Sequence, residues 1–148
     1  MPNRQLNVRA VATTSATPQT LWALLSDATT YANWGPWNAS GYEESNARGK
    51  GALRWMRYGR KTTVERILEL DENRRLVYSV ERGIPVRNYR AEVTLTPTPD
   101  GTHVVWSAQW DRTLLGRAVH WKLRTLYPEV TAKLVAAAEA EDATTRTS

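Results

Sequence analysis

The spacing of the apolar residues changes at Asp111, and no other feature constrains the fold as strongly. Between residues 42 and 112, apolar and polar side chains alternate, which is typical of strands with one buried face. Beyond Asp111 the apolar residues recur every three or four positions, so we expect an amphipathic helix of about 25 residues. Pro128 predicts a bend over residues 124–128 of this helix, because proline cannot donate a backbone hydrogen bond. The helical stripe consists of Leu115, Val119, Leu123, Leu126, Val130, Leu134 and Ala137.

The residues before this region predict one strand and two short helices. Alternation over residues 5–14 indicates the strand. Thr17-Pro18 predicts a helix start, because threonine caps helix N-termini and proline fits the first helical position. Asp27 is a candidate cap for a second short helix, and Gly35-Pro36 ends the helical pattern.

Three turns predict how the strands pair. Tyr58-Gly59-Arg60-Lys61 has glycine at the position that a two-residue type II′ hairpin requires, and this turn places Arg54 opposite Glu65. We expect four-residue loops at Gly83–Val86 and at Thr98–Gly101. Each loop fixes the register of the two strands that flank it.

The last two loops place one set of apolar side chains on a single face of the last three strands. A slip of one residue would turn every side chain to the other face, so this agreement supports both registers. Ala91 lies opposite Ala108 on this face, and larger side chains around this small pair can frame a pocket. The alternative is that the C-terminal helix fills the space. The face consists of Leu76, Tyr78, Val80, Tyr89, Ala91, Val93, Leu95, Val104, Trp106, Ala108 and Trp110.

Composition excludes several kinds of chemistry. The chain has seven Trp, six Tyr and no Phe, so every aromatic ring carries a polar group. It has no Cys and two His, which excludes thiol nucleophiles, disulfides, thiolate metal sites and His-rich metal sites. The sequence contains neither a glycine-rich phosphate loop nor a carboxylate cluster with metal-ligand spacing. We therefore expect no metal and no cofactor.

Charge and hydropathy indicate which partners and which cellular location to expect. The net charge of +5 favours anionic partners, but the basic residues are scattered, so nucleic-acid binding is only a remote alternative. No apolar run is long enough to span a membrane and no signal peptide is visible, so we expect a cytoplasmic protein. We expect a single domain over residues 1–148 with a frayed tail at residues 139–148. An exposed sheet edge favours a homodimer.

Three stretches carry a resemblance to a known group. They read ATPQTLWALLSDATTYANW, KGALRWMRYGRKTTVERILELDENRRLVYSV and GIPVRNYRAEVTLTPTPDGTHVVWSAQWD. In their order and spacing the chain resembles, over residues 5–138, the START-like, helix-grip (SRPBCC) superfamily, in its branch of polyketide cyclases, dehydrases and lipid-transport proteins. The resemblance implies an α+β helix-grip fold, in which a curved antiparallel sheet wraps around a long C-terminal helix and two short helices follow the first strand. It also implies a cavity between the sheet and that helix.

Three residues are candidate catalytic groups. Arg54 could stabilise a carboxylate, a phenolate or an enolate oxygen, with Glu65 orienting the guanidinium. The guanidinium would lower the pKa of Glu65 and make it a poor base at neutral pH. Tyr89 is the candidate for moving a proton, because it lies beside the loop of residues 83–88 at the pocket edge. The alternative for Arg54 and Glu65 is an exposed ion pair, since both faces of their hairpin are equally apolar.

The candidate ligand-binding residues are aromatic. On the sheet they would stack on a planar ligand, or they form ordinary core. Trp34 and Trp37 flank the break after the short helices, where they could form an entrance or only fix the helix exit. His120 could act as an acid or base from the C-terminal helix, or be half-exposed and inert. The full set is Trp34, Trp37, Tyr78, Trp106, Trp110, His120 and Tyr127.

These candidates predict a protein that binds a small hydrophobic or aromatic ligand, acidic if Arg54 anchors it. The resemblance implies the same function, as a cyclase- or dehydrase-like or lipid-binding protein. The alternative is a true enzyme that catalyses aldol cyclisation or dehydration of a polyketide-like substrate. Such an enzyme must fold its substrate, exclude water and stabilise an enolate.

Overall fold

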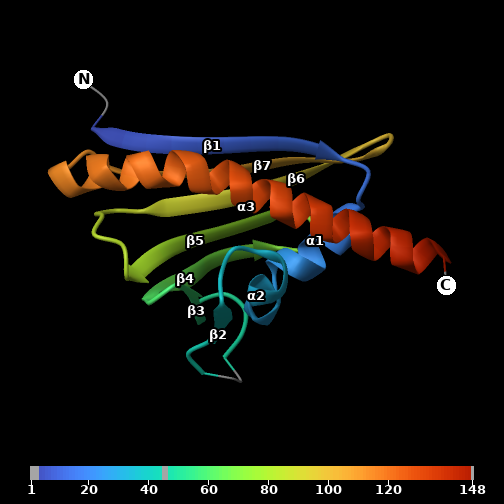
Figure 1. Ribbon diagram of the computed structural model, residues 1–148, viewed down its shortest axis with the longest axis horizontal. Coiled ribbons are helices and arrows are strands. Elements are labelled where there is room, and N and C mark those ends of the chain that lie inside the picture. The colour runs from blue at the N-terminus through green and yellow to red at the C-terminus, as the bar shows by residue number, and fades with distance from the viewer. Residues whose placement is uncertain (1–3, 45–46, 148) are drawn as a thin grey trace.

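A curved antiparallel sheet of seven strands lies against one long helix, in an α+β fold (Figure 1). The computed structural model describes residues 4–44 and 47–147. The strand order is β1-β7-β6-β5-β4-β3-β2, so the first strand pairs with the last. In chain order the elements are β1 (Gln5–Thr14), α1 (Pro18–Leu25), the 3₁₀ helix η1 (Ala28–Thr30), α2 (Tyr31–Trp34), β2 (Ala39–Tyr42), β3 (Leu53–Tyr58), β4 (Lys61–Asp71), β5 (Arg75–Arg82), β6 (Arg90–Thr98), β7 (Gly101–Asp111) and α3 (Leu114–Thr147).

The short helices begin where the sequence predicts. The Thr17 side chain accepts a hydrogen bond from the backbone N–H of Thr20, and Pro18 occupies the first turn of α1. Asp27 caps η1 by accepting from the N–H of Thr29 at 3.0 Å. Helix α2 then ends at Gly35. These caps fix the direction in which the chain returns to the sheet.

The first predicted turn is confirmed in register. Tyr58 pairs with Lys61 and Arg54 pairs with Glu65. Gly59 has a φ of 63°, a value that the first central residue of a type II′ turn requires and that glycine adopts without strain. Strands β3 and β4 therefore place Arg54 and Glu65 side by side on the same face.

The other two registers are also confirmed, but their loops differ in length from the prediction. Ala91 pairs with Ala108, and Thr98 pairs with Gly101, so two residues rather than four form the β6–β7 turn. Between β5 and β6 the connection spans residues 83–89, because the end of β5 pairs with β4 alone. The backbone C=O of Arg87 accepts from the N–H of Asp111, which ties this longer loop to the end of β7.

The core lies between the inner face of the sheet and α3. Every side chain predicted for the apolar sheet face is buried except Val80, which is half-buried. On α3, Leu123, Val130 and Leu134 are buried as predicted. Leu115 is exposed instead, because the first turn of α3 contacts the sheet through its neighbour Gly116, whose C=O accepts from Trp110 Nε1 at 2.9 Å.

The C-terminal helix is longer than predicted, and it includes residues 139–147 of the segment that was expected to fray. Helix α3 runs through Pro128 and continues to Thr147. The Thr14 hydroxyl donates to the Glu139 carboxylate at 2.6 Å, and the Thr17 N–H donates to Asp142 at 2.9 Å. The carboxylates thus bind the β1–α1 connection, and Asp142 also complements the positive end of the α1 dipole.

Candidate functional site

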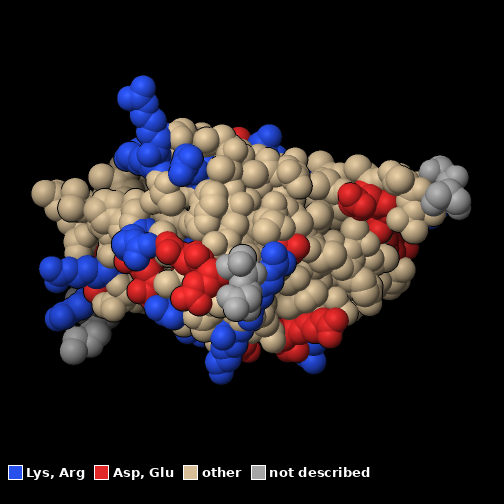
Figure 2. Space-filling view, turned by 90° about the horizontal axis from the view of Figure 1, so that it is seen from below, with Lys and Arg blue, Asp and Glu red and all other residues tan. Residues whose placement is uncertain are grey.

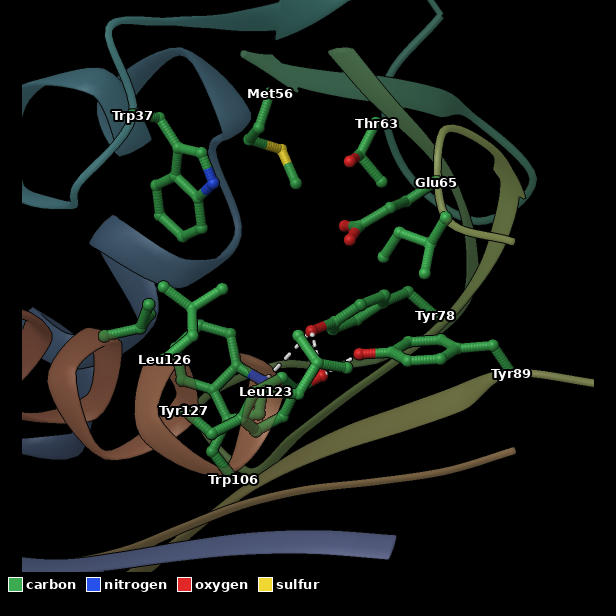
Figure 3. Close-up of a pocket in the computed structure, with 12 residues that line it drawn as sticks. Trp37, Met56, Thr63, Glu65, Tyr78, Tyr89, Trp106, Leu123, Leu126 and Tyr127 are labelled. Carbon is green, nitrogen blue, oxygen red and sulfur yellow. Dashed lines mark hydrogen bonds between the residues drawn. The ribbon is translucent and has the colours of Figure 1, made fainter. Parts of the chain in front are cut away.

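A small cavity lies between the sheet, α3 and the segments that follow α2 and β5 (Figure 3). Its volume is about 70 Å³. One part of its wall is aliphatic and comes largely from α3, and the other part carries a carboxylate and the polar ends of aromatic rings. The lining residues are Trp37, Met56, Thr63, Glu65, Tyr78, Ile84, Tyr89, Trp106, Leu123, Leu126, Tyr127 and Val130.

Glu65 is the one charged side chain among the described lining residues, and it forms a buried ion pair with Arg54. The exposed fractions of the two residues are 6 % and 1 %. The Arg54 Nε donates to Glu65 Oε1 at 2.9 Å, and Nη2 lies 2.9 Å from the same oxygen. The pair therefore points inward, and Glu65 stands between Arg54 and the cavity.

The guanidinium of Arg54 is enclosed by aromatic rings. Its Cζ lies 4.8 Å from the ring centre of Tyr31 and 4.6 Å from that of Tyr78. Nη1 donates to the Tyr31 hydroxyl at 2.8 Å, and that hydroxyl donates to the C=O of Leu25 at 2.7 Å. Arg54 is thus held by ring faces, a hydroxyl and a carboxylate, which suits a planar cation.

Burial and charge act in opposite directions on this pair. Burial raises the pKa of Glu65, and the Arg54 charge offsets part of that rise. Burial lowers the pKa of Arg54, but Tyr31 and Glu65 raise it by more than burial lowers it. The net shift is upward, so the guanidinium stays charged. The guanidinium does lower the pKa of Glu65, but desolvation of the carboxylate is the larger effect. The net shift of this pKa is therefore upward, where the sequence led us to expect a decrease.

A second polar group, here called the hydroxyl cluster, consists of Tyr78, Tyr89, Tyr127 and Trp106. The Trp106 Nε1 donates to the Tyr78 hydroxyl at 3.0 Å, and the Tyr78 and Tyr127 hydroxyls lie 3.4 Å apart. The Tyr127 hydroxyl also forms a hydrogen bond with that of Tyr89 (Figure 3). Burial raises the pKa of all three tyrosines, so each keeps its proton.

Counting protons in the hydroxyl cluster shows what it can offer to a ligand. Three hydroxyls and one indole N–H supply four protons, and three hydrogen bonds link them. Since the indole can only donate, one hydroxyl proton is left over by the bonds within the cluster. All four side chains line the cavity, so this proton is available to an acceptor placed there.

Six of the predicted site residues line this cavity: Glu65, Trp37, Tyr78, Tyr89, Trp106 and Tyr127. Arg54 lies behind Glu65 rather than on the described wall. The small pair Ala91 and Ala108 does not frame the cavity, which instead lies toward β3, β4 and β5. The pocket expected from that pair is therefore displaced along the sheet.

Three predicted ligand-binding residues lie outside the described cavity wall. Trp34 is buried and its Nε1 donates to the Thr30 hydroxyl at 3.1 Å. The Trp110 ring stacks on Tyr89 at 5.7 Å between ring centres, so it supports the hydroxyl cluster from behind. His120 is half-exposed, and its Nε2 lies 3.2 Å from the backbone oxygen of Asn7.

Sequence reasoning missed Tyr31, Met56, Thr63 and Ile84. Met56 and Thr63 could have been found, because they share the face of Arg54 and Glu65 by strand alternation. No local pattern indicates Tyr31, which reaches Arg54 from α2, or Ile84, which reaches the cavity from the β5–β6 loop.

Comparison with known proteins agrees with the fold. The family described as polyketide cyclase/dehydrase and lipid transport matches residues 5–139. No curated protein matches the sequence. No helix among the described residues combines the length and apolarity needed to cross a bilayer.

Several solved structures share the fold. A protein from Thermobifida fusca is 25 % identical with a TM-score of 0.75, and the match covers 89 % of this chain and 92 % of that one. A protein from Nitrosospira multiformis is 21 % identical with a TM-score of 0.73, covering 88 % and 94 %. The protein XoxI from Bacillus cereus is 15 % identical with a TM-score of 0.70, covering 91 % and 95 %.

Proposed function

This chain belongs to the polyketide cyclase/dehydrase and lipid-transport family, and we propose that it binds a small hydrophobic or aromatic molecule in the cavity between the sheet and α3. The observation that carries the proposal is the division of the cavity wall. Leu123, Leu126 and Val130 offer an aliphatic surface, and the hydroxyl cluster faces the same space (Figure 3). Mostly apolar walls with a few convergent polar groups are the usual form of a small-molecule site.

The polar groups favour a neutral, oxygen-bearing ligand. The spare proton of the hydroxyl cluster suits a carbonyl, enol or phenol oxygen, and Glu65 suits a ligand hydroxyl that donates. A ligand carboxylate would face the Glu65 carboxylate, because Arg54 is absent from the described cavity wall. The Arg54 Nη2 forms no hydrogen bond within the described structure, but it is buried. The proposal therefore replaces the acidic ligand, with Arg54 as its anchor, by a neutral one.

The size of the cavity limits what fits without movement. A volume of about 70 Å³ is well below the ~300–1,000 Å³ of typical ligand pockets. We propose that Trp37 and Ile84 move to admit a ligand, because both are half-buried and belong to segments between regular elements. The main rearrangement would then occur at the loops and leave the sheet intact.

Binding is tested with two matched probes. We expect 2-naphthol to change the Trp fluorescence of the protein and to protect it against thermal unfolding, whereas 2-naphthoate, of similar shape but charged, binds at least about tenfold more weakly. The variant Tyr42→Phe, which removes a hydroxyl outside the described cavity wall, serves as a control and should bind both probes as the wild type does. Equal binding of both probes would contradict the neutral ligand, and binding of neither would contradict the pocket function.

A catalytic role is a second candidate, favoured by the raised pKa of Glu65 near the hydroxyl cluster. Glu65 could remove a proton from carbon between two carbonyls while a tyrosine hydroxyl donates to the enolate oxygen, as aldol ring closure requires. The test is exchange of that carbon-bound proton for deuterium in a bound 1,3-diketone. Loss of exchange in Glu65→Gln with retained binding would support catalysis, and absence of exchange in the wild type would exclude it for that substrate.

A further inference from the structure

The start of α3 exposes large apolar side chains. The exposed fractions of Leu114, Leu115 and Trp121 are 85 %, 58 % and 66 %. Only Val11 and Tyr58 are comparable among the described residues, and each belongs to a different strand. Three such residues within two turns of one helix form a contiguous apolar patch, whereas Val11 and Tyr58 are isolated apolar residues.

These side chains give α3 a second apolar face. Leu114, Ala118 and Trp121 follow one another at spacings of four and three residues, which places them on one side of the helix, and all three are exposed. The opposite side carries Leu123 and Tyr127, which are buried against the sheet. No contact with the remaining described structure accounts for the outward face.

Basic residues flank this outward face on both sides. Arg117 and Arg124 lie along one edge and Lys122 along the other, and all three are exposed. The Arg124 Cζ lies 4.3 Å from the ring centre of Trp121. No acidic residue occurs from Arg112 to Pro128. In Figure 2, Lys and Arg project from the left end, where α3 begins in Figure 1, although Asp and Glu are also visible there and near the centre.

We propose that the outward face of α3, made of Leu114, Ala118 and Trp121 with the exposed Leu115 beside it, docks on an anionic lipid surface. An apolar stripe that includes Trp and is bordered by Lys and Arg is the pattern of a helix that lies in the membrane interface. The cations complement anionic headgroups. Two copies of this chain would bring like charges together at the same face, which disfavours self-association.

Docking would bring the cavity close to the lipid. Leu123, Leu126 and Val130 line the cavity from the inner side of the same helix. A helix with its side chains is about 10 Å across, so one helix would separate the ligand from the headgroups. The docking proposal does not depend on the ligand proposal, because it uses the opposite face of α3.

Co-sedimentation with vesicles tests the proposal. We expect the wild type to bind phosphatidylcholine vesicles that contain phosphatidylserine, more weakly as ionic strength rises, and not to bind phosphatidylcholine alone. The double variant Leu114→Ser/Trp121→Ser should lose at least about tenfold in partitioning. Arg117→Gln/Arg124→Gln should lose about fivefold for each removed charge.

Two matched variants serve as controls. Lys50→Gln/Arg74→Gln removes the same charge from exposed positions elsewhere, and Val11→Ser removes an exposed apolar side chain from β1. Both should bind vesicles like the wild type. An equal loss of vesicle binding in the test and control variants would show that the binding is non-specific charge attraction and would overturn the proposal. Absence of vesicle binding by the wild type would also overturn it.

Two further outcomes separate the docking proposal from self-association and from the pocket function. A concentration-dependent dimer that Leu114→Ser/Trp121→Ser abolishes would show that a second copy covers the face, which also overturns the proposal. If 2-naphthol still binds while vesicles do not, docking fails and the pocket function stands. Circular dichroism melting of each variant establishes that these exposed substitutions leave the fold intact.

Discussion

The two polar sites beside the cavity are held in place by different means. The Arg54–Glu65 pair is charged, and its cation is fixed by two ring faces, a hydroxyl and a carboxylate. The hydroxyl cluster is neutral, and hydroxyls can reverse the direction in which they donate. The first site is therefore sensitive to the loss of any partner, and the second can adapt to what enters the cavity. We infer that the ion pair mainly sets stability and that the hydroxyl cluster mainly sets recognition.

The largest effect is expected from Arg54→Met. It leaves the Glu65 carboxylate buried without its cation, and the free energy of unfolding should fall by about 3–5 kcal/mol. Arg66→Met is the matched control, because Arg66 and Glu81 form an exposed pair whose loss should cost less than about 1 kcal/mol. Urea denaturation measures both variants. Similar losses in the two would remove the distinction between the buried pair and an ordinary surface pair.

The pH dependence of stability tests the role of the Arg54–Glu65 pair in a second way. Because burial raises the pKa of Glu65 above 4.5, the folded state binds this proton more tightly than the unfolded state does. Its contribution is fully present below the unfolded pKa and is lost as the pH rises through the folded pKa. We expect the unfolding free energy of the wild type to fall relative to that of Glu65→Gln over this interval, as urea midpoints across the pH range would show. A difference that grows with rising pH would contradict the raised pKa.

A moderate effect on stability and a specific effect on binding are expected from Tyr127→Phe. This change removes the central hydroxyl of the hydroxyl cluster and should cost about 0.5–1.5 kcal/mol. It should also weaken 2-naphthol binding, measured by Trp fluorescence. Tyr42→Phe is the control, since its hydroxyl bonds to the backbone of Ser26 and Ala28 away from the cavity. If Tyr42→Phe weakens binding as much, the effect reflects stability and not recognition.

The smallest effect is expected from His120→Gln. The imidazole belongs to neither polar site and lies at the half-exposed margin of α3 near Asn7. Stability should change by no more than about 0.5 kcal/mol, and ligand affinity should stay within the error of the fluorescence titration. A large loss of affinity would place His120 in the site after all and would require a different path into the cavity.

Much of the fold followed from periodicity and turn chemistry. The turn at Gly59 determined that Arg54 opposes Glu65, because a two-residue hairpin fixes its register. It could not determine which face is inward, because both faces of that hairpin carry apolar side chains. Tyr31 and Tyr78 decide this by stacking on the guanidinium, and they come from other parts of the chain. Contacts of this kind have no local sequence pattern.

The C-terminal segment from residue 139 also shows that contacts distant in sequence have no local sequence pattern. A polar composition predicted fraying, yet Glu139 and Asp142 bind Thr14 and Thr17 more than a hundred residues earlier. The pocket expected at Ala91 and Ala108 lies elsewhere for a related reason: register gives the neighbours within the sheet, but not where α3 leaves a cavity against it.

The pairing of β1 with β7 has a consequence for how the protein is made. Gln5 pairs with Asp111, so the first strand has no partner until nearly the whole sheet has been synthesised. At ~5–20 residues per second, this leaves β1 waiting for roughly 5–20 s. A contact of such long sequence separation also slows the closing of the sheet. The time between translation of the first strand and of the last is therefore the interval in which a nascent chain of this topology is most exposed to misassociation.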